Sequence, residues 1–436
     1  MFVANRGFRG AAAVLAVGLS AAVTGCGVGG DAALAEAEEH VRAAEARAVA
    51  GHGGVDALPG KDTGPVVDAV ERAVAAGIPA AVVRVDDGRG RVVEVAEQAE
   101  WTVADHRIGA GDQVRVGSNT KTMVAVLVLQ LVGENRIGLD DPVDEWLPGA
   151  VPNGGAITVR MLLNHTSGLA NNTDDERVLR SVFGLEERAW TARELLEAGT
   201  AQAPVAAPGE KWFYSNTNYV ALGLVLERVT GHDLSSLLDE RVVEPLGLTK
   251  TYLAGDGASR DGDALAHGYE PDTAHLGAAV PGLPPEFHFV GTERHDHVDV
   301  SAIDPSWAGA AGGVVSTAGD WSRFLTALMS GDLLPPAQLE QMRTMVPADP
   351  ANPAAGRYGL GLAEMPTPCG PVYGHTGGIP GYRSDVFTDA TGTRSAVVVV
   401  TEQQGLGVPA LAEAHQALVA EAACRMNGRT PPPADR

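Results

Sequence analysis

The sequence predicts a mixed α/β (α+β) protein with one antiparallel sheet, flanking helices and a mostly helical second lobe. Two observations predict it. Apolar runs typical of strands lie near both ends of the body of the chain, within residues 80–96 and 373–401. Helical patterns dominate between them, up to about residue 254. Because the strands from both ends must share a sheet to bury their apolar faces, we expect a cleft between that sheet and the helical lobe.

Composition narrows the classes of partner. The chain has 436 residues and 45% hydrophobic residues, which is ample for a large core. Asp and Glu outnumber Lys and Arg by 55 to 32, so the formal net charge is −23. Nucleic acids and anionic lipid surfaces require basic patches, so this balance argues against nucleic acid as a partner.

The N-terminus has the pattern of an export signal. Arg6 and Arg9 precede an apolar stretch at residues 11–23, which is too short to span a bilayer as a structural helix. The segment Val23-Thr24-Gly25-Cys26 that follows resembles the bacterial lipobox, in which the Cys is lipidated and becomes the first residue of the mature protein. The alternative is ordinary secretion with an incidental Cys. We expect residues 1–25 to be a lipoprotein signal peptide and the protein to be extracytoplasmic, held at the membrane by Cys26.

The tether and the first elements follow in order. Residues 26–62 are rich in Ala, Glu and Gly, which predicts a flexible tether. The catalytic domain is expected over residues 63–427. It begins with a helix at 66–76, and strands follow at 80–85 and 92–96, joined by an Asp-Gly turn.

Ser118 and Lys121 form the first chemical motif. They stand three residues apart at the start of an expected helix, residues 119–132, so they lie on one helix face. A helix N-terminus favours negative charge near the serine oxygen, and burial favours a neutral lysine. A serine beside a lysine that can lose its proton is a nucleophile beside a base. The chain has only four lysines, and Lys121 alone has a Ser three residues before it.

Histidines in the middle of the chain offer weaker signals. His165 lies in a loop and could be a base, but we expect its ring to bond to the backbone and shape the cleft. Residues 255–305 are rich in Gly, Pro and Asp, which predicts a long loop region. His295, Asp296 and His297 lie in it. No further ligand has helical spacing, so we expect a solvated loop and no metal.

The C-terminal part returns to strands and closes with a helix. The cysteines at 369 and 424 form a disulfide candidate in an exported protein, the alternative being two separate buried thiols. Residues 428–436 are expected to be a disordered tail. The elements expected in this part are helices at 319–329 and 336–345, strands at 373–375, 383–387 and 395–401, and a helix at 409–424.

Two further motifs complete the candidate site. Tyr214 and Asn216 are two residues apart, so both can point the same way from an extended loop. A Tyr near a cationic Lys is expected to have a lowered pKa, and the Asn amide can hold both a lysine and a substrate carbonyl. His375-Thr376-Gly377 lies on an expected strand that ends in glycines, which allow close approach of a substrate backbone.

Together, Ser118-x-x-Lys121, Tyr214-x-Asn216 and His375-Thr376-Gly377 resemble the three motifs of the penicillin-recognising serine hydrolases. The second is similar to that of DD-peptidases and class C β-lactamases, and the third is similar to that of exported DD-carboxypeptidases. The resemblance includes residues 163–169 and 358–361 and covers about residues 65–424. It implies a β-lactamase/DD-peptidase-like fold, no cofactor and, as in exported DD-peptidases, a Cys369–Cys424 bridge.

The resemblance also implies roles in acyl transfer. Ser118 would attack the carbonyl and form an acyl-enzyme, while Lys121 and Tyr214 would handle its proton. Which of these two is the base stays open, because a coupled pair need not have one answer. The backbone N–H groups of Ser118 and Gly378 would form the oxyanion hole.

The remaining motif residues would bind substrate. Asn216 would hold the substrate amide. His375 would assist proton return or order the site, beside Thr376 and Gly377.

One departure from the family pattern concerns Gly378. Many relatives carry Ser or Thr there, and that hydroxyl helps to hold a substrate carboxylate. Without it, a cation should compensate, and Arg383 and Arg357 are the nearest in sequence. We nominate Arg383.

The sequence therefore predicts a serine D-alanyl-D-alanine carboxypeptidase that acts on peptidoglycan-type D-alanyl peptides and takes β-lactams as covalent ligands. The second reading is an esterase or a D-amino-acid amidase acting on small esters or amides. A β-lactamase and a catalytically silent penicillin-binding sensor come after these. The chain has no G-x-S-x-G sequence, which argues against a Ser-His-Asp hydrolase.

Overall fold

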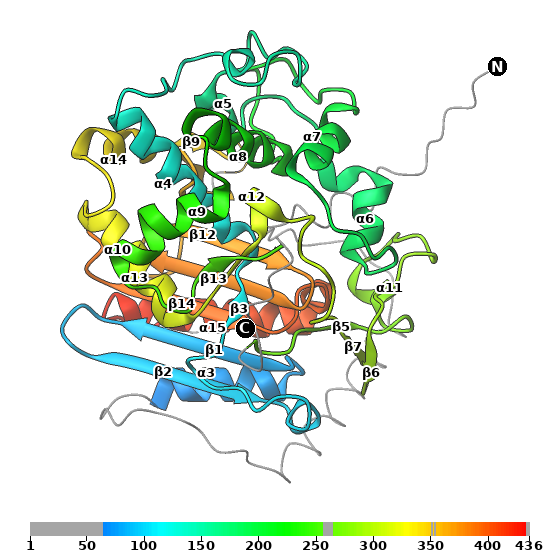
Figure 1. Ribbon diagram of the computed structural model, residues 1–436. Helices are drawn as coiled ribbons and strands as arrows, with labels where there is room; N and C mark the ends of the chain where they lie inside the picture. Colours follow the sequence, from blue (N-terminus) through cyan, green and yellow to red (C-terminus); the bar gives the residue numbers. More distant parts are fainter. Residues whose placement is uncertain (1–63, 256–264, 350–351, 353–354, 433–436) are drawn as a thin grey trace.

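The computed structural model describes residues 64–255, 265–349, 352 and 355–432 (Figure 1). The expected signal peptide, Cys26 and the tether lie outside these residues. In the part of the chain that is described, no helix combines the length and the apolar character needed to cross a membrane.

An eight-stranded antiparallel sheet forms the middle of the protein, in the order β2-β1-β14-β13-β12-β11-β10-β9. It joins both ends of the catalytic domain, because β14 pairs with β1 and places Val398 opposite Val83. This confirms the predicted sheet. Its strands are β1 (Ala80–Asp86), β2 (Val92–Gln98), β9 (Val346–Pro347), β10 (Arg357–Tyr358), β11 (Ala363–Met365), β12 (Val372–Ile379), β13 (Tyr382–Thr388) and β14 (Ser395–Val400).

Helices cover both faces of this sheet, which explains the continuous apolar run in β14. Helices α3 (Gly64–Ala75) and α15 (Pro409–Met426) pack together on one face, where β14 contributes Val398 and Val400 to the core. Val397 and Val399 point to the other face, which packs on α13 (Ala318–Ser330) and the helical lobe. A strand buried on both sides has no solvent side on which to place polar residues.

The helical lobe is built around α4 (Thr120–Gly133), which is buried almost all round. Figure 1 shows α4 above the sheet with the other helices of the lobe around it. They are α5 (Val159–Leu163), α6 (Glu176–Val182), α7 (Ala192–Thr200), α8 (Asn216–Thr230), α9 (Leu234–Leu238), α10 (Glu244–Leu246), α12 (Gly309–Gly312) and α14 (Pro336–Met342).

The expected long loop at residues 255–305 is wrong in part. Of its described residues, three short strands form a separate antiparallel sheet in the order β5-β7-β6, with a short helix beside them. Strands of three residues are too short to show a period of two in the sequence. These elements are β5 (Tyr269–Pro271), α11 (Leu276–Ala279), β6 (Thr292–Arg294) and β7 (His297–Asp299).

A third small sheet, β3-β8-β4, leads the chain into the helical lobe. Its central strand β8 (Val314–Ser316) pairs on one side with β3 (Val114–Arg115), which comes just before the Ser118 motif. On the other side it pairs with β4 (Tyr252–Leu253).

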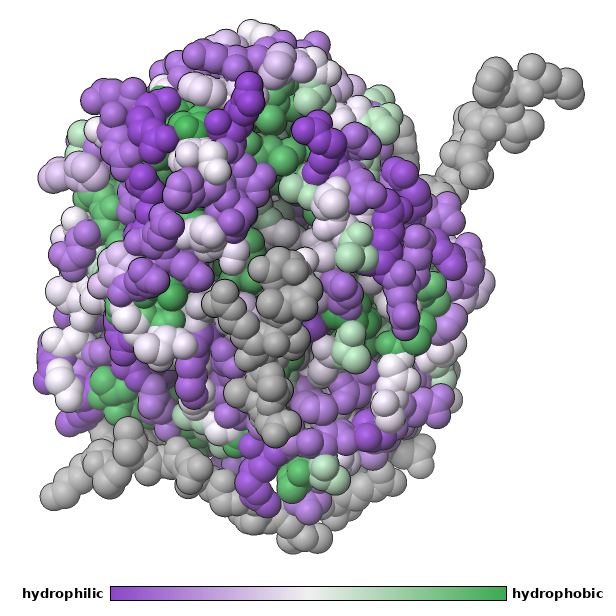
Figure 2. Space-filling view, in the orientation of Figure 1, coloured by the Kyte–Doolittle hydropathy of each residue, from purple (hydrophilic) through white to green (hydrophobic). Residues whose placement is uncertain are grey.

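The predicted disulfide is present between Cys369 and Cys424, with Cα atoms 5.2 Å apart. It joins α15 to the turn before β12. Of the segment expected to be disordered, residues 428–432 are described, and Arg429 Nη1 donates to the Cys369 carbonyl at 3.0 Å. The visible face of the molecule is largely hydrophilic (Figure 2), and Val290 is the one large hydrophobic residue exposed among those described.

Candidate active site

Ser118 lies in the one-turn helix η3 (Gly117–Asn119), which leads directly into α4. Gly117 has a φ of +53°, and a Cβ there would lie 2.9 Å from both the nitrogen and the oxygen of Gly378. Glycine adopts this backbone conformation without strain, and its lack of a side chain admits β12. The close approach brings Ser118 beside the Gly378 backbone, as expected for a nucleophile and two oxyanion-binding N–H groups.

Lys121 is fully buried behind this serine. Its Nζ lies 3.0 Å from Ser118 Oγ, 2.7 Å from Asn216 Oδ1 and 2.7 Å from the carbonyl of Ala311 on α12. Among the described residues it forms no ion pair with a carboxylate. Burial therefore holds the pKa of Lys121 well below its ordinary value. A neutral amine at hydrogen-bond distance from a serine hydroxyl is able to accept its proton.

Tyr214 completes the proton-handling group but differs from expectation. Its side chain shares a hydrogen bond with Ser118, and Lys121 Nζ lies 4.8 Å from the centre of its ring. Burial raises the pKa of Tyr214, and the Ser118 hydrogen bond and the charge of Arg383 offset this only in part. The expected lowering was wrong, because burial of the phenol outweighs both of these effects. Burial thus favours the neutral forms of both Tyr214 and Lys121.

Asn216 begins α8, and its position is set by its neighbours. Its backbone N–H donates to Asn171 Oδ1 at 3.0 Å, and its Oδ1 accepts from Lys121. The Nδ2 end of the amide consequently points away from the lysine. This is the orientation required to donate to a substrate carbonyl, the role expected of Asn216.

The third motif lies on an open part of β12. Strand β11 pairs only with residues 372–374, so the edge of β12 beyond Gly374 is not covered by it. A Cβ at Gly377 would lie 1.9 Å from the carbonyl of Val116, so only glycine lets the strand approach η3. Gly378 is exposed. The structure thus brings the three motifs together around Ser118.

His375 is buried, and both of its ring nitrogens are occupied. Nδ1 lies 2.6 Å from the Thr376 carbonyl, which can only accept, so Nδ1 carries a proton. Nε2 lies 2.8 Å from the hydroxyl of Tyr358 and accepts from it. Burial lowers the pKa of His375 to about 3. Of the two roles open to it, ordering the site fits a neutral, doubly bonded ring better than proton return.

His165 takes the structural role that was expected. Its Nδ1 accepts from the backbone N–H of Ser215 at 3.3 Å and lies 3.1 Å from Asn218 Nδ2. Its ring packs against Tyr214 with centroids 4.3 Å apart. His165 therefore holds the loop that carries the second motif, and it does so at a φ of +62°.

The two arginines considered as carboxylate anchors are both engaged. Arg383 donates through Nε and Nη2 to Asp385 at 3.2 and 2.9 Å, and Asp385 lies 2.9 Å from His415 Nε2 on α15. Arg357 lies on β10, exposed, with Glu364 at 3.6 Å. Neither arginine is placed as a free cation over the cleft.

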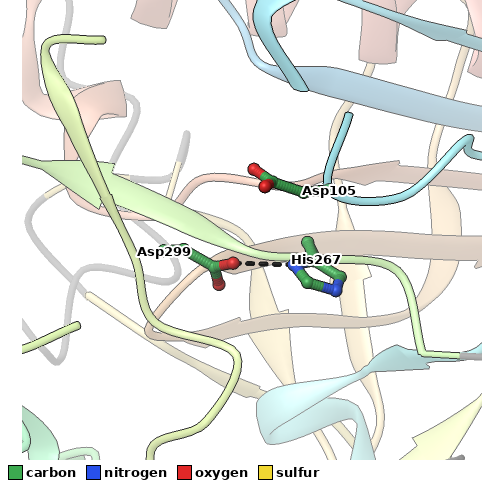
Figure 3. A group of neighbouring side chains, drawn as sticks. All are labelled: Asp105, His267 and Asp299. Carbon is green, nitrogen blue, oxygen red and sulfur yellow. Dashed lines mark hydrogen bonds and ion pairs between the residues drawn. The ribbon is translucent and has the colours of Figure 1, made fainter. Parts of the chain in front are cut away.

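Asp105, His267 and Asp299 form a second group of titratable side chains (Figure 3). Asp105, His267 and Asp299 have potential metal-binding atoms within 4.8 Å of one another. His267 Nδ1 bonds to Asp299 at 2.6 Å, and Arg294 Nε bonds to Asp105 at 2.7 Å. The hydrogen bond that His267 donates to Asp299 raises the pKa of His267. Each carboxylate thus already has a side-chain partner, Arg294 for Asp105 and His267 for Asp299.

The histidines expected in a solvated loop are only partly solvated. His297 stacks on Trp101 with ring centroids 5.0 Å apart, and its Nε2 lies 3.3 Å from the buried Glu402. His295 also stacks on Trp101, at 5.7 Å. The sequence missed this because Trp101 and Glu402 lie far from them along the chain.

Several known proteins are similar to this chain in sequence or fold. The solved structure of a D-stereospecific amidohydrolase from Streptomyces is 36% identical, with a TM-score of 0.67, and the match covers 81% of this chain and 98% of that one. A penicillin-binding protein of Bacillus subtilis (strain 168) is 28% identical over 61% of this chain and 56% of its own length. Esterase EstB of Burkholderia gladioli is 37% identical over 31% of this chain and 36% of its own.

The chain thus spans about half or less of the length of these two curated relatives. Residues 66–422 match the family described as Beta-lactamase. That match covers most of the chain and includes all three motifs around Ser118. The protein therefore belongs to the beta-lactamase family, the penicillin-recognising serine hydrolases that its motifs resemble.

Proposed function

We propose that the protein is a D-stereospecific serine amidohydrolase, which cleaves the amide bond that follows a D-amino acid. The observation that carries the hydrolytic chemistry is Lys121, which is buried 3.0 Å from Ser118 Oγ and has no carboxylate partner among the described residues. The substrate class is supported by the likeness to the Streptomyces amidohydrolase, which covers nearly all of that protein. The D-alanyl peptides predicted from the sequence are members of this class.

The proposed reaction has two halves. Ser118 Oγ attacks the substrate carbonyl while Lys121 Nζ takes its proton, and the N–H groups of Ser118 and Gly378 bind the resulting oxyanion. The C–N bond then breaks, the leaving nitrogen receives a proton through Tyr214, and Ser118 is left acylated. Water repeats the sequence on the acyl-enzyme and releases the acid. β-Lactams enter the same first half and remain attached as acyl groups.

A D-alanyl-D-alanine carboxypeptidase is the second candidate. One observation favours it: Arg383 is the cross-strand partner of Gly378 in the β12–β13 register, and its charge reaches Tyr214. An arginine at this position lies beside the third motif. It could bind a terminal carboxylate if one of its two hydrogen bonds to Asp385 were exchanged for one to the substrate.

We also propose that the protein works outside the cytoplasm, anchored by lipidated Cys26. The lipobox-like segment and the apolar stretch before it support this. The Cys369–Cys424 bridge supports it too, since disulfides persist in oxidising compartments.

Paired substrates test the proposed function. The p-nitroanilides of D-alanine and L-alanine should differ in kcat/KM by about a hundredfold in favour of D, or roughly 2.7 kcal/mol. Ser118→Ala should abolish turnover of both. Equal turnover of the two enantiomers, or residual activity in Ser118→Ala, would overturn the proposal.

A further inference from the structure

The side chain of Gln403 occupies the space beside the third motif where residue 378 has no side chain of its own. A Cβ built on Gly378 would have Gln403 Oε1, Cδ and Nε2 as its nearest atoms, at 2.4, 2.7 and 3.0 Å. Gly378 is exposed, and its backbone would lie 2.9 Å from a Cβ on Gly117, the residue before Ser118. A carboxamide from the loop after β14 thus stands where most residues at 378 would place their own side-chain atoms.

The backbone around Gln403 is held by a buried carboxyl group. Glu270 accepts from the N–H of Gly381 through Oε1 and from the N–H of Gln404 through Oε2, both at 2.7 Å. It is fully buried. One side chain therefore ties the turn after β12 to the loop that carries Gln403, and this fixes the carboxamide relative to Gly378.

The carboxamide has hydrogen-bonding capacity in reserve. Gln403 Oε1 is buried, and no donor reaches it among the described residues. An acceptor without a partner is costly in the free protein and is satisfied by a group that brings an N–H. A carboxylate offers only acceptors, whereas a carboxamide offers both donors and an acceptor. The open capacity beside Gly378 therefore suits a neutral amide.

The charges nearby point the same way. Arg383 is the cross-strand neighbour of Gly378, and it donates two hydrogen bonds to Asp385. Glu402, which precedes Gln403, is fully buried. A free carboxylate over Gly378 would meet a guanidinium that already has a carboxylate partner, and burying an uncompensated charge is expensive.

We propose that Gln403 is a specificity-determining residue, which binds the substrate group over Gly378 and selects a neutral amide there over a free carboxylate. This rests on the proposed function and narrows its substrate class: the favoured substrates carry a blocked C-terminal end, and a free D-alanine terminus is disfavoured. A site built to hydrogen-bond one group rejects the analogue that leaves its own polar atoms unpaired.

The test compares N-acetyl-D-Ala-D-Ala with its C-terminal amide, using the full chain. The wild type should turn over the amide with a kcat/KM at least about tenfold above that of the acid, the order of one or two hydrogen bonds. Gln403→Ala should lower kcat/KM for the amide about three- to tenfold and leave the acid nearly unchanged. The isosteric Gln403→Glu should depress the acid further. Gln338→Ala on α14 is the remote control and should leave the ratio unchanged.

A mutant cycle with Gly378 separates Gln403 from general damage. Gly378→Ser alone should crowd the carboxamide, whereas Gly378→Ser combined with Gln403→Ala has room for the hydroxyl and should shift the preference towards the acid. An acid-to-amide ratio unaffected by Gln403→Ala and Gln403→Glu would overturn the proposed role while the hydrolase stands. A wild type that prefers the acid would overturn it in favour of the carboxypeptidase. Failure to hydrolyse either peptide would overturn the proposed function together with this role.

Discussion

Two polar clusters lie on opposite faces of β13, and only one of them pairs its buried charge with an opposite charge. On one face Ser384 Oγ accepts from Asn119 Nδ2 at 2.7 Å, beside the cluster of Ser118 and Lys121. On the other face Arg383, Asp385 and His415 form a buried ion-pair group. Successive strand residues point to opposite faces, so the side chain of Ser384 belongs to one cluster and those of its two neighbours to the other.

The difference lies in counter-charge. Within the described part of the chain Lys121 has only neutral acceptors, so burial pushes its pKa down and leaves an amine able to take a proton. Burial alone would raise the pKa of Asp385, but the charges of Arg383 and His415 hold it well below its usual value. Partners of opposite charge stabilise the ionised form of a buried group, which then does not exchange its proton easily. A buried group without such partners is pushed towards its neutral form and can take part in proton transfer.

The largest effect should come from removing the ability of residue 121 to lose its proton. Lys121→Arg keeps a cation but cannot act as a base, so it should lower acylation about a thousandfold, nearly as much as Lys121→Ala. Stopped-flow acylation by a chromogenic β-lactam measures this. Lys250→Arg, the same change on the surface, is the control. Retention of activity within about tenfold in Lys121→Arg would reduce Lys121 to an electrostatic anchor.

Breaking the ion-pair group of Arg383, Asp385 and His415 should lower the free energy of unfolding. Arg383→Ala leaves Asp385 buried with only His415, which should cost about 3 kcal/mol of unfolding free energy, the low end for a broken buried pair. Urea unfolding measures the loss. Arg160→Ala removes an exposed ion pair with Asp140 and should cost no more than about 1 kcal/mol. Similar losses in both variants would show that the Arg383–Asp385 pair contributes no more than a surface contact.

A smaller effect should appear in the pH dependence of stability. The pKa of His375 is about 3 in the folded state, against 6.5 for the ordinary side chain. Between these values the unfolded chain takes up a proton that the folded chain refuses, so the stability present above pH 6.5 falls as the pH falls towards 3. His375→Asn should therefore lose less stability than the wild type between pH 7 and pH 5. Parallel curves from urea titrations would contradict this.

Sequence reasoning succeeded where the signal was local. The valine run of β14 and the apolar residues of α4 predicted which segments form the core. The spacing of Ser118 and Lys121 places both on one helix turn, so it could be recognised from the sequence. The cysteine pair needed only the expectation of export. Each of these features depends on residues close in sequence or on a pattern that composition reveals.

Sequence reasoning failed where a neighbour came from elsewhere in the fold. Asp385 stands two residues from Arg383, yet its engagement with His415 depends on how α15 packs. Burial, which no motif records, reversed the expected pKa shift of Tyr214. The backbone carbonyl of Ala311 and the side-chain amide of Gln403 come from segments far from Ser118 in the sequence. Their positions depend on how the chain folds, so no pattern of residue types could have found them.

The most direct test of the central claim is the intact mass of the protein after reaction with a fluorescent penicillin, followed by peptide mapping of the adduct. If Ser118 is the nucleophile activated by Lys121, the wild type gains the mass of one acyl group, which maps to Ser118 and is absent from Ser118→Ala. An adduct of the same mass on Ser118→Ala, mapped to another residue, would contradict the account.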